Sequence, residues 1–547
     1  MPADLILHSG TVLTVDADFT THQAVAVRGD RILAVGDDRT ILDLAGPHTR
    51  IVDLAGGTVL PGLNDSHLHL QWWGLARAEV DLSAAGSLDE ARELVRRHAD
   101  AQPEGAWVRG RGWHERVLMG DRAGGLSAAM FDDVCGGRPM FLEHFSAHGG
   151  LLNTAGLRAA GITSATASPP GGEVVRDPAT GEPTGVLKEA ALQLLDGVLP
   201  EPTAAERQDA VVAAIAELNR RGITSVTDPI VTPEMLRDYV TLRREGRLSA
   251  RLTTLLHWTW PSVQTPLGVL EEAMTYVGST TGLGDDLLRI GGCKLIADGV
   301  AALGTAWMST PYHHDGTCGA LVTEGADDEE RVAALHALVR LLHEHRFQVQ
   351  VHATGDRACD TAVEALVAAL TADPWPDARH VLIHANLPSS ETVQAMAEHG
   401  ILANVNALVK WQAAAGLVGI IDEDRWHRMM PARSMVEAGV VVCDASDAPI
   451  TDPDWRLALQ MLVTRVPRGS DVAAGPDERL TREQAIRAWT AAPAWQDHAE
   501  PDKGTLEPGR FADLCVVAED LMAVPDDALH AVTPVLTVLG GEIVFGA

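Results

Sequence analysis

Basic residues are scarce in this sequence. Its 43 lysines and arginines face 75 aspartates and glutamates, which leaves a formal net charge of −32 at pH 7. A chain this acidic is repelled by phosphate backbones and by anionic lipid surfaces. We therefore expect neither a nucleic acid partner nor a membrane partner, and a small molecule becomes the expected substrate.

Long apolar runs and cysteine motifs are also missing. No stretch of 18 uncharged apolar residues occurs, and the first residues, MPADLILHSGTVLTV, lack a basic segment followed by an apolar one. Only six cysteines occur among 547 residues, and none forms a CxxC pair. These features predict a strand at the N-terminus, reduced thiols and a cytoplasmic location.

The two ends of the chain resemble each other more than they resemble the middle. Residues 1–56 and 491–547 contain short apolar segments broken by turns, which predicts one small β-sandwich built from both ends. Residues 57–490 alternate apolar runs with helical patterns, which is typical of βα units. The eight candidate strands of this middle region are 58–70, 222–228, 250–258, 287–299, 347–356, 380–386, 401–407 and 440–447.

Helix signals separate several of these strands, but one region does not fit. The pairs Thr203 with Glu206 and Thr481 with Gln484 are capping boxes that open predicted helices over 203–221 and 482–489. Residues of about 75–202, after the first strand, are rich in glycine and proline. We interpret this region as an insertion over the barrel mouth, because loops this long are functional or disordered.

Two histidines stand at the end of the first candidate strand. His67 and His69 are two residues apart in NDSHLHL. The period of two along a strand predicts that both imidazoles point to the same side, inside the barrel. Two convergent imidazoles suit a divalent metal such as zinc, although two packed histidines explain this pair equally well.

Ionisable residues end three further strands. His352 ends FQVQVH, His384 ends HVLIH, and Asp447 follows VVVCDAS. Barrel enzymes carry their active residues at this end of their strands, and buried ionisable groups are costly unless they are paired or bind metal. Each residue alone is more often a packed core residue, but the set predicts a metal site.

A lysine lies inside another apolar run. Lys294 occurs in LLRIGGCKLIADG, where burial as a cation is costly and lowers the pKa of the amine. A neutral amine reacts with CO2 to form a carbamate, an anionic bridge between two metal ions. An ion pair with Asp298 or Asp228 is the alternative, and the chemistry of the residues alone leaves both open.

The motifs taken together resemble a known family. They are PGLNDSHLHL, GRGWHE, SAHGGLLNTAGL, GVLKEAAL, KLIADG, VHATGDRA, LIHANL, ASDAPI and GTLEPGRFADLCVV. They span residues from about 57 to 517 and resemble the amidohydrolase superfamily, in particular its family 3 branch, which includes N-substituted formamide deformylases. This resemblance implies an α/β fold, a (β/α)8 TIM barrel with a β-sandwich from both chain ends.

The resemblance also implies the site. It gives His67, His69, Lys294, His352, His384 and Asp447 as metal ligands, with Lys294 as a carboxylated bridging lysine. Asp447 is favoured over the nearby Asp444 because Ser-Asp-Ala-Pro fits the motif. The resemblance further implies one or two Zn2+ ions and a homodimer. The implied reaction is hydrolysis of a non-peptide C–N bond by a metal-activated water, with Asp447 as the catalytic proton acceptor.

Further residues are candidates for contact with the substrate, each with an ordinary structural role as the alternative. Tryptophan is more frequent than phenylalanine and tyrosine together, 13 against 7 and 3, which suggests a flat-walled pocket. The candidates are Trp72, Trp113, His148, Glu189 and His314.

Two alternative functions remain open from the sequence. The same ligands serve an isomerase or a decarboxylase, and a metal-binding barrel can also act as a non-catalytic regulator. Product analysis separates the first alternative from hydrolysis. The complete ligand set argues against the second.

Overall fold

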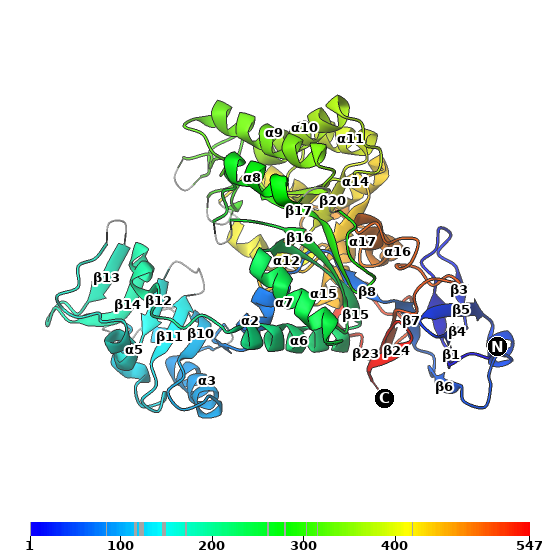
Figure 1. Ribbon diagram of the computed structural model, residues 1–547, viewed down its shortest axis with the longest axis horizontal. Coiled ribbons are helices and arrows are strands. Elements are labelled where there is room, and N and C mark those ends of the chain that lie inside the picture. The colour runs from blue at the N-terminus through cyan, green and yellow to red at the C-terminus, as the bar shows by residue number, and fades with distance from the viewer. Residues whose placement is uncertain are drawn as a thin grey trace. The chain divides into compact units, whose positions relative to one another are not determined.

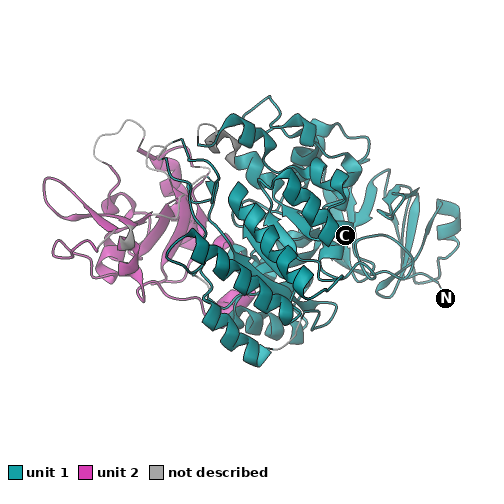
Figure 2. Cartoon of the chain, turned by 90° about the horizontal axis from the view of Figure 1, so that it is seen from above, with its two compact units in different colours: residues 1–73, 211–547 teal, residues 74–210 magenta. Residues whose placement is uncertain are grey.

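The chain folds into two compact units of mixed α/β structure. The computed structural model describes residues 2–546 except 84, 114–117, 120–124, 145–148, 170–171, 260–261, 278–280, 302–303, 314–315 and 418–419. Residues 1–73 and 211–547 make up unit 1, and residues 74–210 make up unit 2, as the colours of Figure 2 show. None of the helices that the structure describes is long and apolar enough to cross a lipid bilayer.

An eight-stranded parallel sheet forms the centre of unit 1 (Figure 1). Its order follows the chain, and each pair of neighbouring strands is parallel. The eight predicted strands are all present, so the predicted barrel of βα units is confirmed as a nearly closed, TIM-like sheet. The strands are β8 (Leu63–Asp65), β15 (Ile223–Val231), β16 (Arg251–Leu256), β17 (Leu288–Ile296), β18 (Val349–Ala353), β19 (Val381–His384), β20 (Leu402–Val405) and β21 (Val442–Asp444).

The two edge strands of this sheet meet through the segments that follow them. Asp447 donates its backbone N–H to the His67 carbonyl at 2.8 Å, and His69 donates its own to Ala448 at 2.9 Å. The Ser66 hydroxyl donates to the Asp444 carbonyl at 2.9 Å. These bonds hold the ends of β8 and β21 together, so ligands that are distant in sequence lie side by side.

Helices cover the outside of the barrel strands (Figure 1). The predicted helix starts are confirmed: Thr203 and Glu206 exchange hydrogen bonds of 2.8 and 3.3 Å, and Thr481 and Gln484 form a capping box. The main helices are α6 (Ala204–Arg220), α7 (Pro233–Arg244), α8 (Leu267–Val277), α9 (Asp328–Glu344), α10 (Asp356–Ala372), α11 (Ser390–His399), α12 (Ala407–Leu417), α13 (Glu423–Arg428), α14 (Ala432–Ala438), α15 (Trp455–Thr464), α16 (Arg482–Arg487) and α17 (Ala491–Gln496).

The first predicted strand, 58–70, is wrong in its extent. The structure divides it into β7 (Thr58–Pro61), which pairs with β22 (Leu514–Val517), and β8, which belongs to the barrel. Gly62 separates them because its backbone passes Thr224 so closely that a Cβ atom would lie 2.2 Å from the threonine Oγ1. Consequently His67 and His69 lie beyond β8 and not on it.

Two further sheets are built from the ends of the chain. One has the order β5-β4-β1-β6 and uses only N-terminal residues, whereas the other, β24-β23-β22-β7-β2-β3, mixes both ends. Apolar side chains of both sheets share one core, and the predicted sandwich stays a prediction that this core supports. The strands are β1 (Leu5–His8), β2 (Thr11–Leu13), β3 (Thr21–His22), β4 (Ala24–Arg28), β5 (Arg31–Gly36), β6 (Arg50–Asp53), β23 (Pro534–Leu539) and β24 (Glu542–Phe545).

Unit 2 holds a sheet of its own within the predicted insertion. Six strands follow the order β13-β14-β12-β11-β10-β9, and two apolar cores lie among the unit's described residues. Its elements are β9 (Val80–Asp81), α3 (Leu88–Ala101), β10 (Val108–Trp113), β11 (Met140–His144), β12 (Gly149–Leu152), α5 (Thr154–Ala159), β13 (Gly172–Arg176) and β14 (Pro183–Glu189). Helix α2 (Leu70–Arg77) begins in unit 1 and ends in unit 2.

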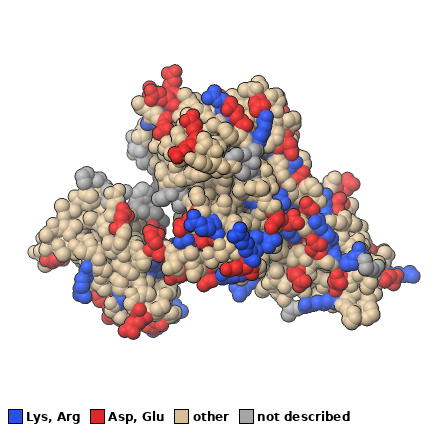
Figure 3. Space-filling model, viewed as in Figure 1, with Lys and Arg blue, Asp and Glu red and all other residues tan. Residues whose placement is uncertain are grey.

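All six cysteines are free thiols, five of them buried. On the face drawn in Figure 3, lysine and arginine side chains lie among aspartates and glutamates.

A buried lysine of α12 gives a prediction about stability. Burial lowers the pKa of Lys410 to about 6, while its amine donates to the Met429 carbonyl. Between about pH 6 and the ordinary lysine pKa of 10.5, the unfolded chain therefore binds more protons than the folded chain, and stability rises with pH in this range. Because Arg465 also donates to the Met429 carbonyl at 2.9 Å, Lys410→Met leaves that oxygen bonded. We expect Lys410→Met to stabilise the protein at pH 7 by about 1–3 kcal/mol.

The measurement is the unfolding temperature of both proteins at pH 7 and pH 9. The difference in unfolding temperature between the methionine variant and the native protein should shrink at pH 9. At that pH, the proton that Lys410 must release when the native chain folds costs less free energy. Parallel pH profiles of the two proteins would contradict the titration of Lys410.

Candidate metal centre

The predicted ligands gather where the barrel strands end. His352 lies on β18, and His384 is the last residue of β19. His67 and Asp447 lie two and three residues beyond the ends of β8 and β21. His384 and Asp447 have φ angles of 69° and 58°, a left-handed conformation that costs energy in most residues and recurs at functional sites.

Three of these side chains meet around one point. The Nε2 atoms of His67 and His69 lie 3.4 and 3.3 Å from Oδ1 of Asp447. Ligand atoms of the three residues lie within 4.8 Å of one another, and all three are buried or nearly so. This spacing is suited to a single shared cation.

The remaining histidines extend this cluster along the inner rim. The rings of His67 and His384 have centroids 5.5 Å apart, and those of His384 and His352 are 4.4 Å apart. The four imidazoles therefore form a continuous row, His69, His67, His384 and His352.

Burial keeps three of these rings uncharged. It lowers the pKa of His67 to about 3 and that of His352 to about 4, with a further contribution from Lys294, and it holds the pKa of His384 well below its usual range. At neutral pH each of these three rings is therefore in the neutral form, which is the form that binds metal.

Asp447 is the anionic member of the cluster. Burial acts to raise its pKa, but hydrogen bonds from His67 and His69 and smaller electrostatic contributions from His67 and His384 outweigh burial and hold the pKa well below the usual range. The neighbouring Asp444 has a different task, because its carboxylate accepts the Ala407 N–H and the Trp489 indole N–H at 2.9 and 2.8 Å. Of the two aspartates, Asp447 is the one that faces the histidines.

Lys294 lies on β17 with its side chain buried. Burial lowers the pKa of its amine to about 7, and the charge of Asp447 opposes this effect. Within the described part of the chain Lys294 has no ion pair. Asp298 instead accepts backbone N–H groups of Thr354 and Gly355, and Asp228 accepts the Tyr239 hydroxyl. The ion pairs considered as the alternative from the sequence are therefore absent.

The donor set fits a divalent metal of intermediate softness. Neutral imidazole nitrogens and one ionised carboxylate oxygen are the ligands that Zn2+ and related ions prefer. The carboxylate oxygen lies only 3.3–3.4 Å from two ring nitrogens, and His67 Nδ1 is buried without a partner among the described residues. A cation bound among these three side chains would contact both ring nitrogens and the carboxylate oxygen.

One positioning residue was not predicted from the sequence. Asn406, directly after β20, accepts a hydrogen bond from Nδ1 of His384 at 2.6 Å and donates to the Ala445 carbonyl at 3.2 Å. This contact fixes the proton on Nδ1 and leaves Nε2 of His384 free for a metal.

Substitution of Asn406 should therefore weaken metal binding. We expect Asn406→Leu to lower the metal affinity by about 10- to 100-fold, because His384 loses the acceptor that orients its ring. Asn406→Asp retains that acceptor and should restore most of the affinity. Competition titration against a chromophoric chelator measures both variants, and equal affinity of Asn406→Leu and the native protein would contradict the role.

Other buried groups around the centre also escaped the sequence analysis. His257 follows β16, and its ring nitrogens lie 3.3 and 3.4 Å from the carbonyls of Lys294 and Ser262. The rule that found His352, an ionisable residue ending an apolar strand, also applies to His257. Asp65 accepts backbone N–H groups of Ser446 and His67 at 3.1 and 3.5 Å, and burial raises its pKa to about 7.

The five predicted substrate contacts lie in different parts of the chain. Trp72 is 42% exposed, and its ring lies 5.4 Å from that of His69, so it borders the cluster. Trp113 is buried in unit 2 and donates its indole N–H to the Leu142 carbonyl at 2.8 Å, as a packing residue does. The backbone of Glu189 ends β14, and nothing is described of its side chain. His148 and His314 lie outside the described residues.

The fold and the cluster together define a class of protein. Neutral imidazoles and an ionised carboxylate at the carboxyl-terminal mouth of a parallel barrel are typical of barrel enzymes that use a metal. Residues 50–545 match the amidohydrolase family, and the chain belongs to that family. The predicted family and the prediction of an amidohydrolase are confirmed.

Individual relatives agree over almost the full length. The N-substituted formamide deformylase of Arthrobacter pascens is 30% identical over 530 residues, covering 94% of each chain. An uncharacterized metal-dependent hydrolase from Pyrococcus horikoshii OT3 superimposes with a TM-score of 0.75 and 24% identity, covering 95% of this chain and 99% of that one. The atrazine chlorohydrolase of Arthrobacter aurescens TC1, solved with zinc, has a TM-score of 0.54 and 15% identity, covering 99% and 95%.

Proposed function

We propose that this protein hydrolyses a non-peptide C–N bond, an amide, formamide or cyclic amide, at the cluster of His67, His69 and Asp447. The observation that carries the proposal is the 3.3–3.4 Å approach of two imidazoles to one buried carboxylate oxygen. The formamide deformylase relative supports the choice of bond.

His67, His69 and Asp447 would hold one divalent ion, and His352, His384 and Lys294 would hold a second. Zn2+ is the proposed metal, supported by the donor set and by the zinc bound to the atrazine chlorohydrolase of similar fold. Such an ion, when bound, lowers the pKa of water towards 7 and polarises a carbonyl oxygen.

The residues of the chain supply the proton transfers. Oδ1 of Asp447 accepts the proton of the attacking water as the water oxygen bonds to the carbonyl carbon. The same carboxyl group then returns the proton to the leaving nitrogen as the C–N bond breaks. Trp72 would provide an apolar wall beside His69 for the substrate.

Lys294 would serve as a carbamate. Its pKa of about 7 leaves much of the amine neutral at physiological pH, and the amine then bonds to CO2 and releases one proton. Carbon-13 NMR of protein equilibrated with labelled bicarbonate tests this step. A carbamate signal that is lost in Lys294→Met is expected, and no signal in metal-loaded protein would exclude it.

The function itself is tested by metal analysis and an assay panel. Metal-loaded protein should hydrolyse at least one substrate among N-formyl amines, N-acyl amines and lactams, and oxygen from labelled water should enter the acid product. Inertness towards the whole panel would contradict hydrolysis, and turnover without incorporation of water oxygen would point to an isomerase or decarboxylase.

A further inference from the structure

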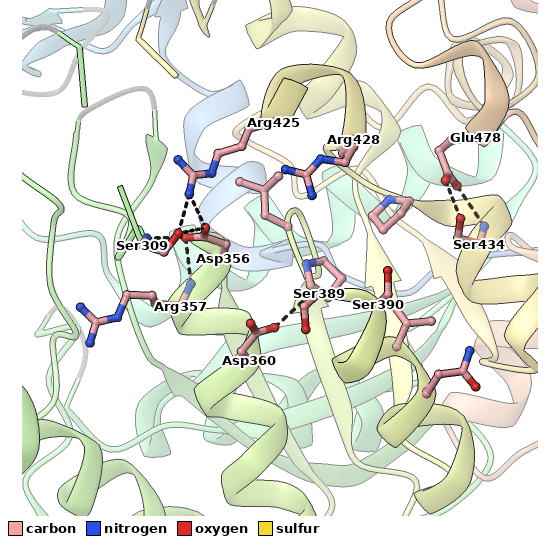
Figure 4. Close-up of a pocket in the computed structure, with 15 residues that line it drawn as sticks. Ser309, Asp356, Arg357, Asp360, Ser389, Ser390, Arg425, Arg428, Ser434 and Glu478 are labelled. Carbon is pink, nitrogen blue, oxygen red and sulfur yellow. Dashed lines mark hydrogen bonds and ion pairs between the residues drawn. The ribbon is translucent and has the colours of Figure 1, made fainter. Parts of the chain in front are cut away.

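A cavity of unit 1 lies apart from the predicted metal ligands. It has a volume of about 350 Å3, within the range of small-molecule sites. Its walls come from the first residues of α10 and α11, from α13, and from the start of α14 (Figure 4). None of the six predicted metal ligands lines it, and we call it the α10–α11 cavity.

One acidic group of this cavity is fully engaged by the protein. Asp356 accepts hydrogen bonds from the backbone N–H and the hydroxyl of Ser309 at 2.7 and 2.5 Å. It also pairs with Arg425 at 2.7 Å, and Arg425 makes a second ion pair, of 3.1 Å, with Asp422. Asp356 and Arg425 thus neutralise each other.

The other two carboxylates are occupied as well. Asp360 accepts the backbone N–H of Ser389 at 3.0 Å and the Thr392 hydroxyl at 2.6 Å. Glu478 accepts the backbone N–H and hydroxyl of Ser434 at 2.9 and 2.5 Å. Both oxygens of Asp356 and of Glu478 are therefore bonded, and Asp360 is held through Oδ1.

Arginines of the cavity keep side-chain N–H groups that no described residue accepts. Arg428 is an exposed residue at the end of α13. Its side chain forms no hydrogen bond or ion pair with any residue that the structure describes, and Figure 4 draws it without a dashed line. The guanidinium of Arg357 stacks on Trp307 and approaches a carboxylate, that of Asp328, only to 3.6 Å. Positive charge with free N–H groups thus faces a cavity on a protein whose net charge is −32.

The cavity also has an apolar side. Leu387, Pro388, Val393 and Pro431 contribute to its lining. A ligand that uses the whole cavity must therefore present an anionic group to the arginines and a hydrocarbon body to this side.

We propose that the α10–α11 cavity binds a small organic anion, a carboxylate or a phosphate monoester with an apolar body, through the guanidinium of Arg428. A planar guanidinium binds the two oxygens of such a group in a bidentate manner, which explains why an arginine without a protein partner is placed here. The site is separate from the metal cluster and does not depend on the proposed hydrolysis.

Isothermal titration calorimetry of the native protein with benzoate, phenyl phosphate and inorganic phosphate tests the proposal. We expect saturable binding of benzoate or phenyl phosphate, tighter than that of inorganic phosphate, and a loss of about tenfold or more in Arg428→Gln. Benzoate against phenyl phosphate identifies the oxyanion. The matched control is Arg340→Gln, an exposed arginine of α9, which should bind as the native protein does.

Removal of the metal separates this site from the metal centre. Binding at the cavity should persist after treatment with a chelator, whereas an anion that binds at the histidine cluster should be lost. The proposal is overturned if Arg428→Gln binds as tightly as the native protein, if binding disappears with the metal, or if neither organic anion shows saturable binding.

Discussion

Asp447→Asn is expected to lower kcat by at least about a thousandfold and to leave the unfolding temperature of the metal-free protein nearly unchanged. The amide cannot accept a proton at neutral pH, and it replaces the single anionic oxygen that faces Nε2 of His67 and His69. The fold should survive because the backbone N–H of residue 447 still donates to the His67 carbonyl. Asparagine also tolerates the φ angle of 58° at this position better than most residues do.

Asp444→Asn is the matched control for this prediction. Asp444 is buried three residues away, and its two oxygens accept the Ala407 N–H and the Trp489 indole N–H. An asparagine can retain only one of these bonds, so we expect a loss of about 1–2 kcal/mol of stability with little change in kcat. Retained turnover in Asp447→Asn, or equal losses of kcat in both variants, would remove Asp447 from the proton-transfer role.

The sequence predicted those features of the barrel that depend on periodic patterns. Apolar runs such as VQVHA and VLIH are buried on the strands, and an ionisable residue at the end of such a run is costly unless the site uses it. That argument alone placed His352 and His384 at the mouth of the barrel. The same argument, applied consistently, would have included His257.

Features that depend on contacts between segments distant in sequence could not be predicted. The break between β7 and β8 arises because Gly62 passes against Thr224, a contact between residues 162 positions apart. The role of Asn406 depends on the neighbouring β19, which brings His384 within 2.6 Å of its amide oxygen. Arg428 of the α10–α11 cavity belongs to no sequence motif. It matters because its side chain has no partner among the described residues, and a sequence does not show this.

Removal of the metal is expected to abolish turnover and to lower the unfolding temperature. An ion bound only by the folded state stabilises it by about 2.7 kcal/mol when its free concentration is 100 times Kd. Dialysis against a chelator removes this contribution, and one or two equivalents of Zn2+ should restore both activity and unfolding temperature. Differential scanning calorimetry, metal analysis and the hydrolysis assay measure the three quantities on the same samples.

Paired histidine variants show whether the lost stability belongs to this cluster. In the double variant His67→Ala/His69→Ala the chelator-dependent shift of the unfolding temperature should shrink to the contribution of the second proposed ion, because two of the three residues of the His67, His69 and Asp447 cluster are gone. The control is His343→Gln, which alters a buried histidine that hydrogen-bonds His380 at 2.9 Å and is not among the ligands. It should keep the full chelator-dependent shift. A chelated, metal-free protein with undiminished kcat would contradict a metal-dependent reaction, since the remaining acids and bases would then suffice for catalysis.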